Sequence, residues 1–170
     1  MRKLATFIAL AAASAAAPLA LGATDPDASF YKKAAEGGLF EVEAGKQAET
    51  ESNDQRVKDF GNMLVTDHTA ADLKLRSLAA SKDITLPNSP SVGQMAEKAK
   101  LDVLTGDTYD KSFIHGQIKA HQQAIALFQK EIASGQDADA RAFASSTLPT
   151  LKKHLKEARA LAAAESTGKS

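Results

Sequence analysis

The sequence contains no cysteine and no tryptophan, and neither sign of charge is in excess. Without cysteine the chain can form no disulfide, no thiolate metal site and no lipid-modified cysteine. The 21 basic and 21 acidic residues balance, and no basic patch with interleaved aromatic residues occurs, which excludes a typical nucleic-acid-binding protein. A nucleophile-elbow motif and a glycine-rich phosphate loop after a strand are also absent. These absences favour a binding protein over an enzyme.

The N-terminal segment differs in composition from the rest of the chain. Two basic residues are followed by an uncharged apolar run over residues 4–21 that ends in small residues. This order is typical of a secretory signal peptide. We predict that residues 1–22 are a signal peptide cleaved near Gly22/Ala23, and that the mature protein is periplasmic or secreted without a transmembrane segment. An uncleaved membrane anchor is the alternative, although the run is only marginally long enough to span a bilayer.

Residues 25–165 have the composition and the periodicity of helices. Alanine, lysine, glutamate, glutamine and leucine dominate, and apolar residues recur with a period near 3.6. The pattern predicts four long helices and one short helix, over about 27–51, 53–81, 90–103, 108–134 and 138–164. The connection that carries the short helix is long enough to cross the bundle. The predicted fold class is therefore all-α, a ferritin-like four-helix bundle with a short extra helix in the crossover between the second and third long helices. Residues 166–170 are predicted to form a disordered tail.

Each long helix carries one metal-ligand side chain on or beside its apolar stripe. These residues are Glu41, His68, His121 and His154. Neutral imidazole is the commonest metal ligand, and a buried carboxylate costs several kcal/mol unless a cation or hydrogen bonds compensate it. Side chains that project inward from separate helices are the usual way in which bundles build metal sites. We predict that the four residues hold one transition-metal ion (Zn, Fe, Cu or Mn) in the bundle core.

Residues near the three histidines indicate how many metal ions the site holds and which other side chains are ligands. The residues three positions before the three histidines are Val65, Ile118 and Leu151 rather than glutamate, so the carboxylates of a di-iron bundle are missing and one metal is favoured over two. Asp67 is adjacent to His68 and points about 100° away from it, toward a neighbouring helix or solvent, and of these two we expect a solvated carboxylate. His115 lies about 120° from His121 and is not expected to be a ligand.

The alternative interpretation needs no metal. Each histidine can be a packed, hydrogen-bonded core residue, and Glu41 can pair with a histidine or a lysine across the core. The protein is then a structural or interaction module of the cell envelope, whose exposed helix faces bind envelope proteins or a second copy of the chain. The sequence does not identify the partner.

Five segments together carry a family resemblance: Ala34-Ala35-x-Gly37-Gly38-Leu39-x-Glu41-Val42, Val57-Lys58-x-Phe60, Met63-Leu64-Val65-x-Asp67-His68-Thr69, His121-Gln122 and Thr147-Leu148-Pro149-x-Leu151-x-x-His154. They resemble the DUF4142 family of exported bacterial proteins, which are often labelled predicted outer membrane proteins. The resemblance extends over about residues 30–162 and implies a ferritin-like bundle with no established activity. In such sequences the histidine of the third long helix is commonly preceded by aspartate, whereas Ala120 precedes His121 in this chain.

Overall fold

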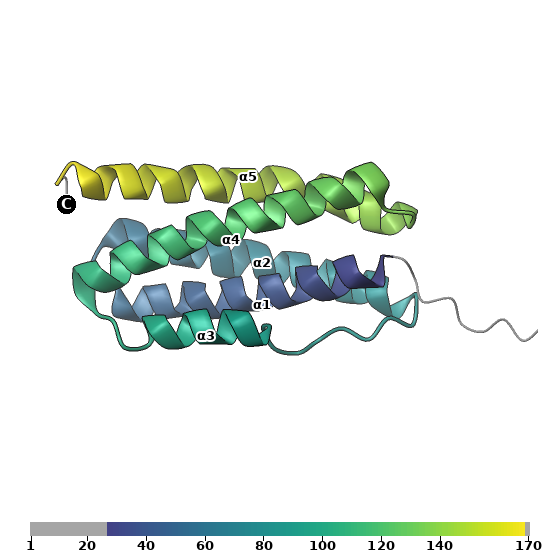
Figure 1. Cartoon of the computed structure of the whole chain (residues 1–170), viewed down its shortest axis with the longest axis horizontal. Helices are drawn as coiled ribbons and strands as arrows, with labels where there is room; N and C mark the ends of the chain where they lie inside the picture. Colours follow the sequence, from purple (N-terminus) through teal and green to yellow (C-terminus); the bar gives the residue numbers. More distant parts are fainter. Residues whose placement is uncertain (1–26, 169–170) are drawn as a thin grey trace, which may run out of the picture.

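A computed structural model describes residues 27–168 as helices joined by short connections and one long one (Figure 1). The all-α class is confirmed, and each predicted helix is present with ends close to those expected. The predicted signal peptide at residues 1–22 lies outside the described residues, as do residues 169 and 170. The helices are α1 (Ala28–Glu51), α2 (Gln55–Ala80), α3 (Val92–Leu101), α4 (Gly106–Ser134) and α5 (Ala138–Ser166).

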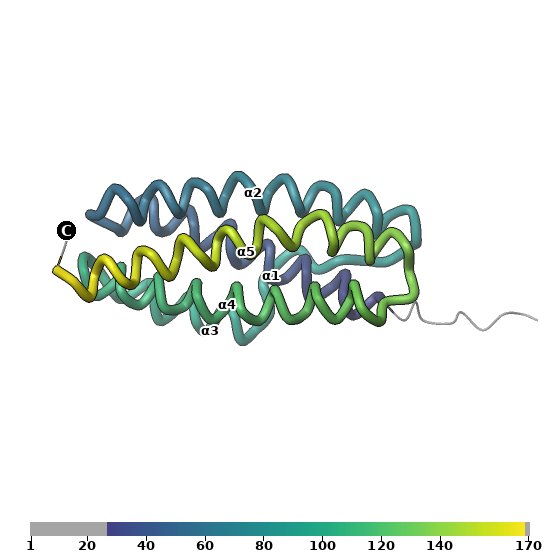
Figure 2. The backbone as a smooth tube through the Cα atoms, turned by 90° about the horizontal axis from the view of Figure 1, so that it is seen from above, coloured from purple at the N-terminus to yellow at the C-terminus, as the bar shows by residue number. Residues whose placement is uncertain are grey.

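The four long helices pack as two pairs, α1 with α2 and α4 with α5 (Figures 1 and 2). Within each pair the helices are antiparallel. After α2, the chain returns along the whole bundle through α3, so that α4 begins at the end where α2 began (Figure 1). Helices α2 and α4 therefore run in the same direction, which confirms the predicted crossover.

Side chains cap the N-terminal ends of three helices. Asp54 precedes α2 and accepts a hydrogen bond from the backbone amide two residues later, and Asp137 does the same for α5. Ser91 and Gln94 form a capping box at the start of α3. Because the first amides of a helix have no partner within the helix, these side chains fix where each helix begins.

Two glycines let α1 and α2 approach closely. A Cβ atom on Gly45 would lie 2.6 Å from the Gly61 carbonyl oxygen, and a Cβ on Gly61 would lie 2.7 Å from the Gly45 carbonyl oxygen. Both distances are below ordinary van der Waals contact, so the two helices depend on these glycines at their crossing. The absence of a side chain at Gly45 thus permits close packing of α1 against α2.

The apolar core consists of two clusters, one toward each end of the bundle. The first includes Phe60, Phe113, Ile114 and Leu161, and the second includes Phe30, Phe128, Phe143 and Leu151. Along α2, α4 and α5 the residues of the two clusters are separated by His68, His121 and His154. The histidines therefore form a polar layer near the middle of the bundle, enclosed by apolar side chains on both sides.

Candidate metal centre

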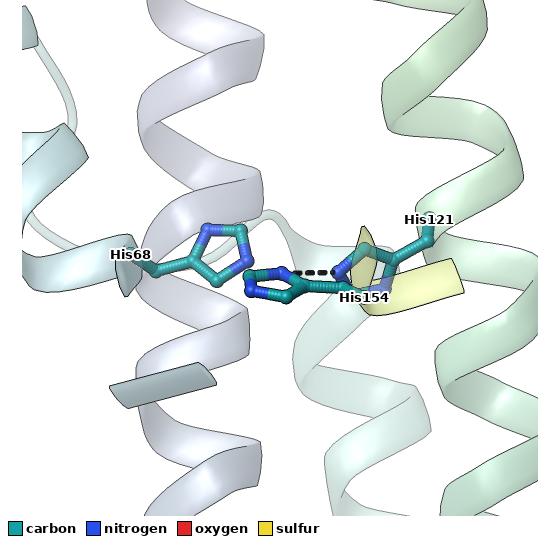
Figure 3. A group of neighbouring side chains, drawn as sticks. All are labelled: His68, His121 and His154. Atoms are coloured by element: carbon teal, nitrogen blue, oxygen red, sulfur yellow. Dashed lines mark hydrogen bonds between the residues drawn. The ribbon is translucent and has the colours of Figure 1, made fainter. Parts of the chain in front are cut away.

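Three histidines from three helices meet in the bundle interior (Figure 3). His68 comes from α2, His121 from α4 and His154 from α5, and each side chain is buried. One ligand nitrogen from each ring lies within 4.8 Å of the others. The ring centroids of His121 and His154 are 5.2 Å apart, and that of His68 lies 5.3 Å from His154 and 5.8 Å from His121. The fold thus brings together three of the four residues that the sequence singled out.

The hydrogen bonds of His121 determine where its ring proton lies. Nδ1 of His121 is 3.0 Å from the backbone carbonyl oxygen of Gln117, one turn earlier on α4. A carbonyl oxygen can only accept, so Nδ1 carries the hydrogen and donates it. In the neutral ring the other nitrogen, Nε2, therefore presents a lone pair.

The same reasoning applies to His154. Its Nε2 is 2.9 Å from Oδ2 of Asp67, a carboxylate on α2. An ionised carboxylate can only accept, so Nε2 of His154 carries the hydrogen and Nδ1 presents a lone pair in the neutral ring.

The two lone pairs face each other. Nε2 of His121 and Nδ1 of His154 are 3.2 Å apart (dashed line in Figure 3). Two acceptors at this distance repel unless a proton or a cation lies between them. Nε2 of His68 is also buried, and it has no hydrogen-bond partner among the described residues. The hydrogen bonds of His121 and His154 thus leave two electron-pair donors facing each other, with no hydrogen of either ring between them.

Burial opposes protonation of the three rings. It lowers the pKa of His121 to about 4, with the neighbouring His154 ring as the second cause. The pKa of His154 is lowered mainly by burial, against the opposing effect of Asp67. The pKa of His68 is well below its usual value because of burial and the two adjacent imidazoles. Near neutral pH the rings are therefore neutral, and a shared proton is not the favoured bridge between them.

Glu41 is buried on α1 but is not part of the three-nitrogen group. Burial raises the pKa of its carboxyl group to about 8, while a hydrogen bond with the Gln117 side chain acts in the opposite direction. Its Oε2 atom has no hydrogen-bond partner among the described residues. Glu41 lines the same cavity as His68 and His121, so the structure places it near the cluster without placing it among the converging nitrogens.

The expectation of a solvated Asp67 was wrong. Its side chain is partly exposed, with a relative accessibility of 34%, yet its carboxylate binds the buried His154. Asp67 lies about 100° around α2 from His68, and this position lets it reach α5 while it stays partly exposed. The packing of α2 against α5 determines this contact. His115, in contrast, is exposed and lies outside the histidine group, as expected.

Comparisons with known proteins agree with the fold. A family model described as "Domain of unknown function (DUF4142)" matches residues 10–161, and none of the curated proteins matches the chain. Two solved structures are similar, each with 12% sequence identity and a TM-score of 0.66. One, a DUF305 protein from Streptomyces coelicolor described as secreted, is matched over 78% of this chain and 87% of that one. The other, CopM in its Cu(II)-bound form, is matched over 80% of this chain and 95% of that one.

At 12% sequence identity, these two structures show a similar fold and support no further comparison. In the described part of the chain, no helix combines the length and the apolar character that a membrane crossing requires.

Proposed function

Because the chain belongs to the DUF4142 family, whose description assigns no function, we propose a function from the site itself. The protein binds one transition-metal ion through His68, His121 and His154, and acts in the periplasm or outside the cell in metal handling or envelope stress. The observation that carries this proposal is the pair of facing lone pairs on His121 and His154, 3.2 Å apart.

The spacing of these two nitrogens suits a common ion. Zinc–imidazole bonds are about 2.0–2.1 Å long, so two nitrogens of a tetrahedral site are about 3.3 Å apart. The nitrogens of His121 and His154 already lie at nearly this separation. The ligand nitrogens of the whole group lie within 4.8 Å of one another. A side-chain rotation that moves the His68 ring nitrogen by about 1–2 Å would therefore complete a three-nitrogen site.

The groups around the rings also fit metal ligands. In metal sites a ligating histidine usually donates its other N–H to a carbonyl or a carboxylate, which fixes the ring and raises its basicity. The Gln117 carbonyl does this for His121, and Asp67 does it for His154. Two of the three rings are therefore already oriented as ligands.

The donor set narrows the choice of ion. Three imidazoles without thiolate suit zinc, copper, iron or nickel, and Cu(II) binds most tightly in the divalent series. A likeness to a protein solved with Cu(II) bound gives copper further support. We propose Cu(II) or Zn(II), with Glu41 as the candidate for a fourth ligand because its buried Oε2 is unpartnered.

Titration calorimetry on the mature, metal-free protein tests this function. We expect one equivalent of Cu(II) or Zn(II) to bind, and we expect His68→Ala and His154→Ala to lose most of the affinity. His115→Ala is the matched control, because it removes an exposed imidazole from the same bundle. Equal affinity in the wild type and in the His68 and His154 variants would reject the site.

One observation favours the alternative, an interaction module of the cell envelope that needs no metal. Val92, Met95 and Val103 lie in or beside α3 and are exposed, although their side chains are apolar. Such residues on one short segment are typical of a surface that meets a partner. A module of this kind keeps its melting temperature in excess EDTA, whereas a bundle stabilised by bound metal does not.

A further inference from the structure

A cavity of about 850 Å³ lies beside the histidine layer, between the long helices and α3. His68 and His121 form part of its wall, whereas His154 does not. The volume is within the range of sites that bind small molecules, about 300–1,000 Å³. The cavity is much larger than a single metal ion needs, so the proposed metal site does not account for it.

The inner wall of the cavity is mainly apolar and aromatic. Leu75, Phe113, Phe128 and Leu151 are buried side chains that line it. Charged residues also line the cavity, and Lys33, Lys100 and Lys119 among them are exposed, so they lie where the cavity meets solvent. An apolar interior with a charged mouth is typical of a pocket for an organic molecule.

Glycines on three helices leave this pocket open. Gly38 of α1, Gly93 of α3 and Gly116 of α4 all line it. Apart from its own helix backbone and chain neighbours, a Cβ added at any of these glycines meets no described atom within 4 Å. Unlike Gly45 and Gly61, these glycines are not required for close helix packing. They add no side chain at the wall of the cavity.

We propose that this cavity binds a small, uncharged and largely apolar organic molecule, about the size of two or three aromatic rings. Binding of such a molecule is favourable because it removes apolar surface of both the cavity wall and the molecule from water. A charged molecule would lose its hydration on entering the cavity. The histidines beside it are neutral and offer no buried charge of opposite sign to compensate this loss. The proposal does not rest on metal binding, since the lining that carries it is apolar.

The test uses the neutral fluorescent probe N-phenyl-1-naphthylamine with the mature protein in excess EDTA. We expect saturable binding at one site, with enhanced and blue-shifted probe fluorescence. Gly38→Leu and Gly116→Leu extend side chains into the open space, and each is expected to weaken binding by about tenfold or more. Ala133→Leu is the matched control, because it adds similar bulk at an exposed position of α4 outside the cavity.

Two results with the variants would overturn the proposal. One is unchanged probe affinity in Gly38→Leu and Gly116→Leu. The other is loss of binding in Val92→Ser or Val103→Ser, which would place the probe on the exposed apolar residues near α3. Methyl NMR spectra of the wild type provide an independent measurement, with probe-induced shifts expected at Leu75 and Leu151. Absence of these shifts contradicts the proposal even if a leucine variant fails to fold.

Discussion

Asp67 links α2 to the histidine of α5, and this single contact sets the orientation of the His154 ring. Without the carboxylate, the ring can rotate or change tautomer, and Nδ1 is no longer held as the free nitrogen. We predict that Asp67→Ala weakens Cu(II) or Zn(II) binding by about 10–100-fold, the usual effect of removing such a partner. Competition titration with a chelator of known affinity measures the change.

Asp59→Ala is the control for this experiment, since it removes an exposed carboxylate from the same helix. Its metal affinity should equal that of the wild type. If Asp59→Ala and Asp67→Ala weaken binding equally, the effect comes from the general charge of α2, and the role assigned to Asp67 is wrong.

Glu41 gives the metal-free protein a distinctive dependence on pH. Its pKa is raised from 4.5 to about 8, so the folded state holds a proton that the unfolded state releases. The stability that this proton provides is complete below pH 4.5 and is lost as the pH rises through 8. The histidines act oppositely, because their lowered pKa values cost stability as the pH falls below 6.5.

Between pH 6.5 and 8 the effect of Glu41 can therefore be observed separately. We predict that the free energy of unfolding of the metal-free wild type falls by up to about 2 kcal/mol over this interval. In Glu41→Gln it should stay nearly constant, because the amide does not titrate. Urea unfolding at a series of pH values measures this, and parallel profiles for the two proteins would show that Glu41 is not protonated when buried.

The histidines could be found from the sequence, whereas their hydrogen bonds could not. His68 and His121 each occupy a position in an apolar stripe with a period of 3.6, so burial followed directly from their spacing. The contact between Asp67 and His154 depends on how far α2 and α5 rotate about their axes, which one helix pattern does not specify. The same limit applies to Glu41, whose burial was expected but whose place outside the histidine group was not.

At the scale of helices, the crossing of α1 and α2 depends on Gly45 and Gly61. A methyl group at Gly45 collides with the backbone of α2 rather than with a flexible side chain, so the helices must separate. We predict that Gly45→Ala lowers the free energy of unfolding by about 1–3 kcal/mol. Thermal and urea unfolding followed by circular dichroism measure the effect.

Gly116→Ala is the matched control for the helix crossing. Gly116 is also within a helix, but a Cβ there meets open space, so the better helix propensity of alanine should stabilise the protein by about 0.5–1 kcal/mol. Opposite signs for the two variants are expected. A stabilising Gly45→Ala would show that α1 and α2 are not in close contact at this point.

The helices themselves were predictable because long amphipathic segments with little β-branching leave few alternatives. The crossover was also predictable, since the connection between α2 and α4 is long enough to return along the bundle. The glycines of α1 show the limit of this reasoning. In sequence, Gly38 and Gly45 look alike as small residues, yet Gly45 packs against α2 while Gly38 faces the cavity, and only the positions of α3 and α4 distinguish them.

For the whole molecule, a metal bound by α2, α4 and α5 links the two helix pairs. Binding to the folded state alone raises stability by about 2.7 kcal/mol at a free metal concentration of 100 times the dissociation constant. For a domain of this size we predict a rise in the melting temperature of about 5–10 °C. Differential scanning calorimetry should show the rise with Cu(II) or Zn(II), its reversal with EDTA, and no rise in His68→Ala.

X-ray absorption spectroscopy of the mature protein loaded with one equivalent of Cu(II) or Zn(II) tests metal binding by the three rings most directly. It reports the atoms bound to the ion, and imidazole rings give a characteristic outer-shell scattering pattern. We predict about three imidazole nitrogens at about 2.0–2.1 Å from the ion, and fewer imidazole nitrogens in His121→Ala. A shell made only of water or carboxylate oxygens, unchanged in that variant, would contradict a metal centre formed by His68, His121 and His154.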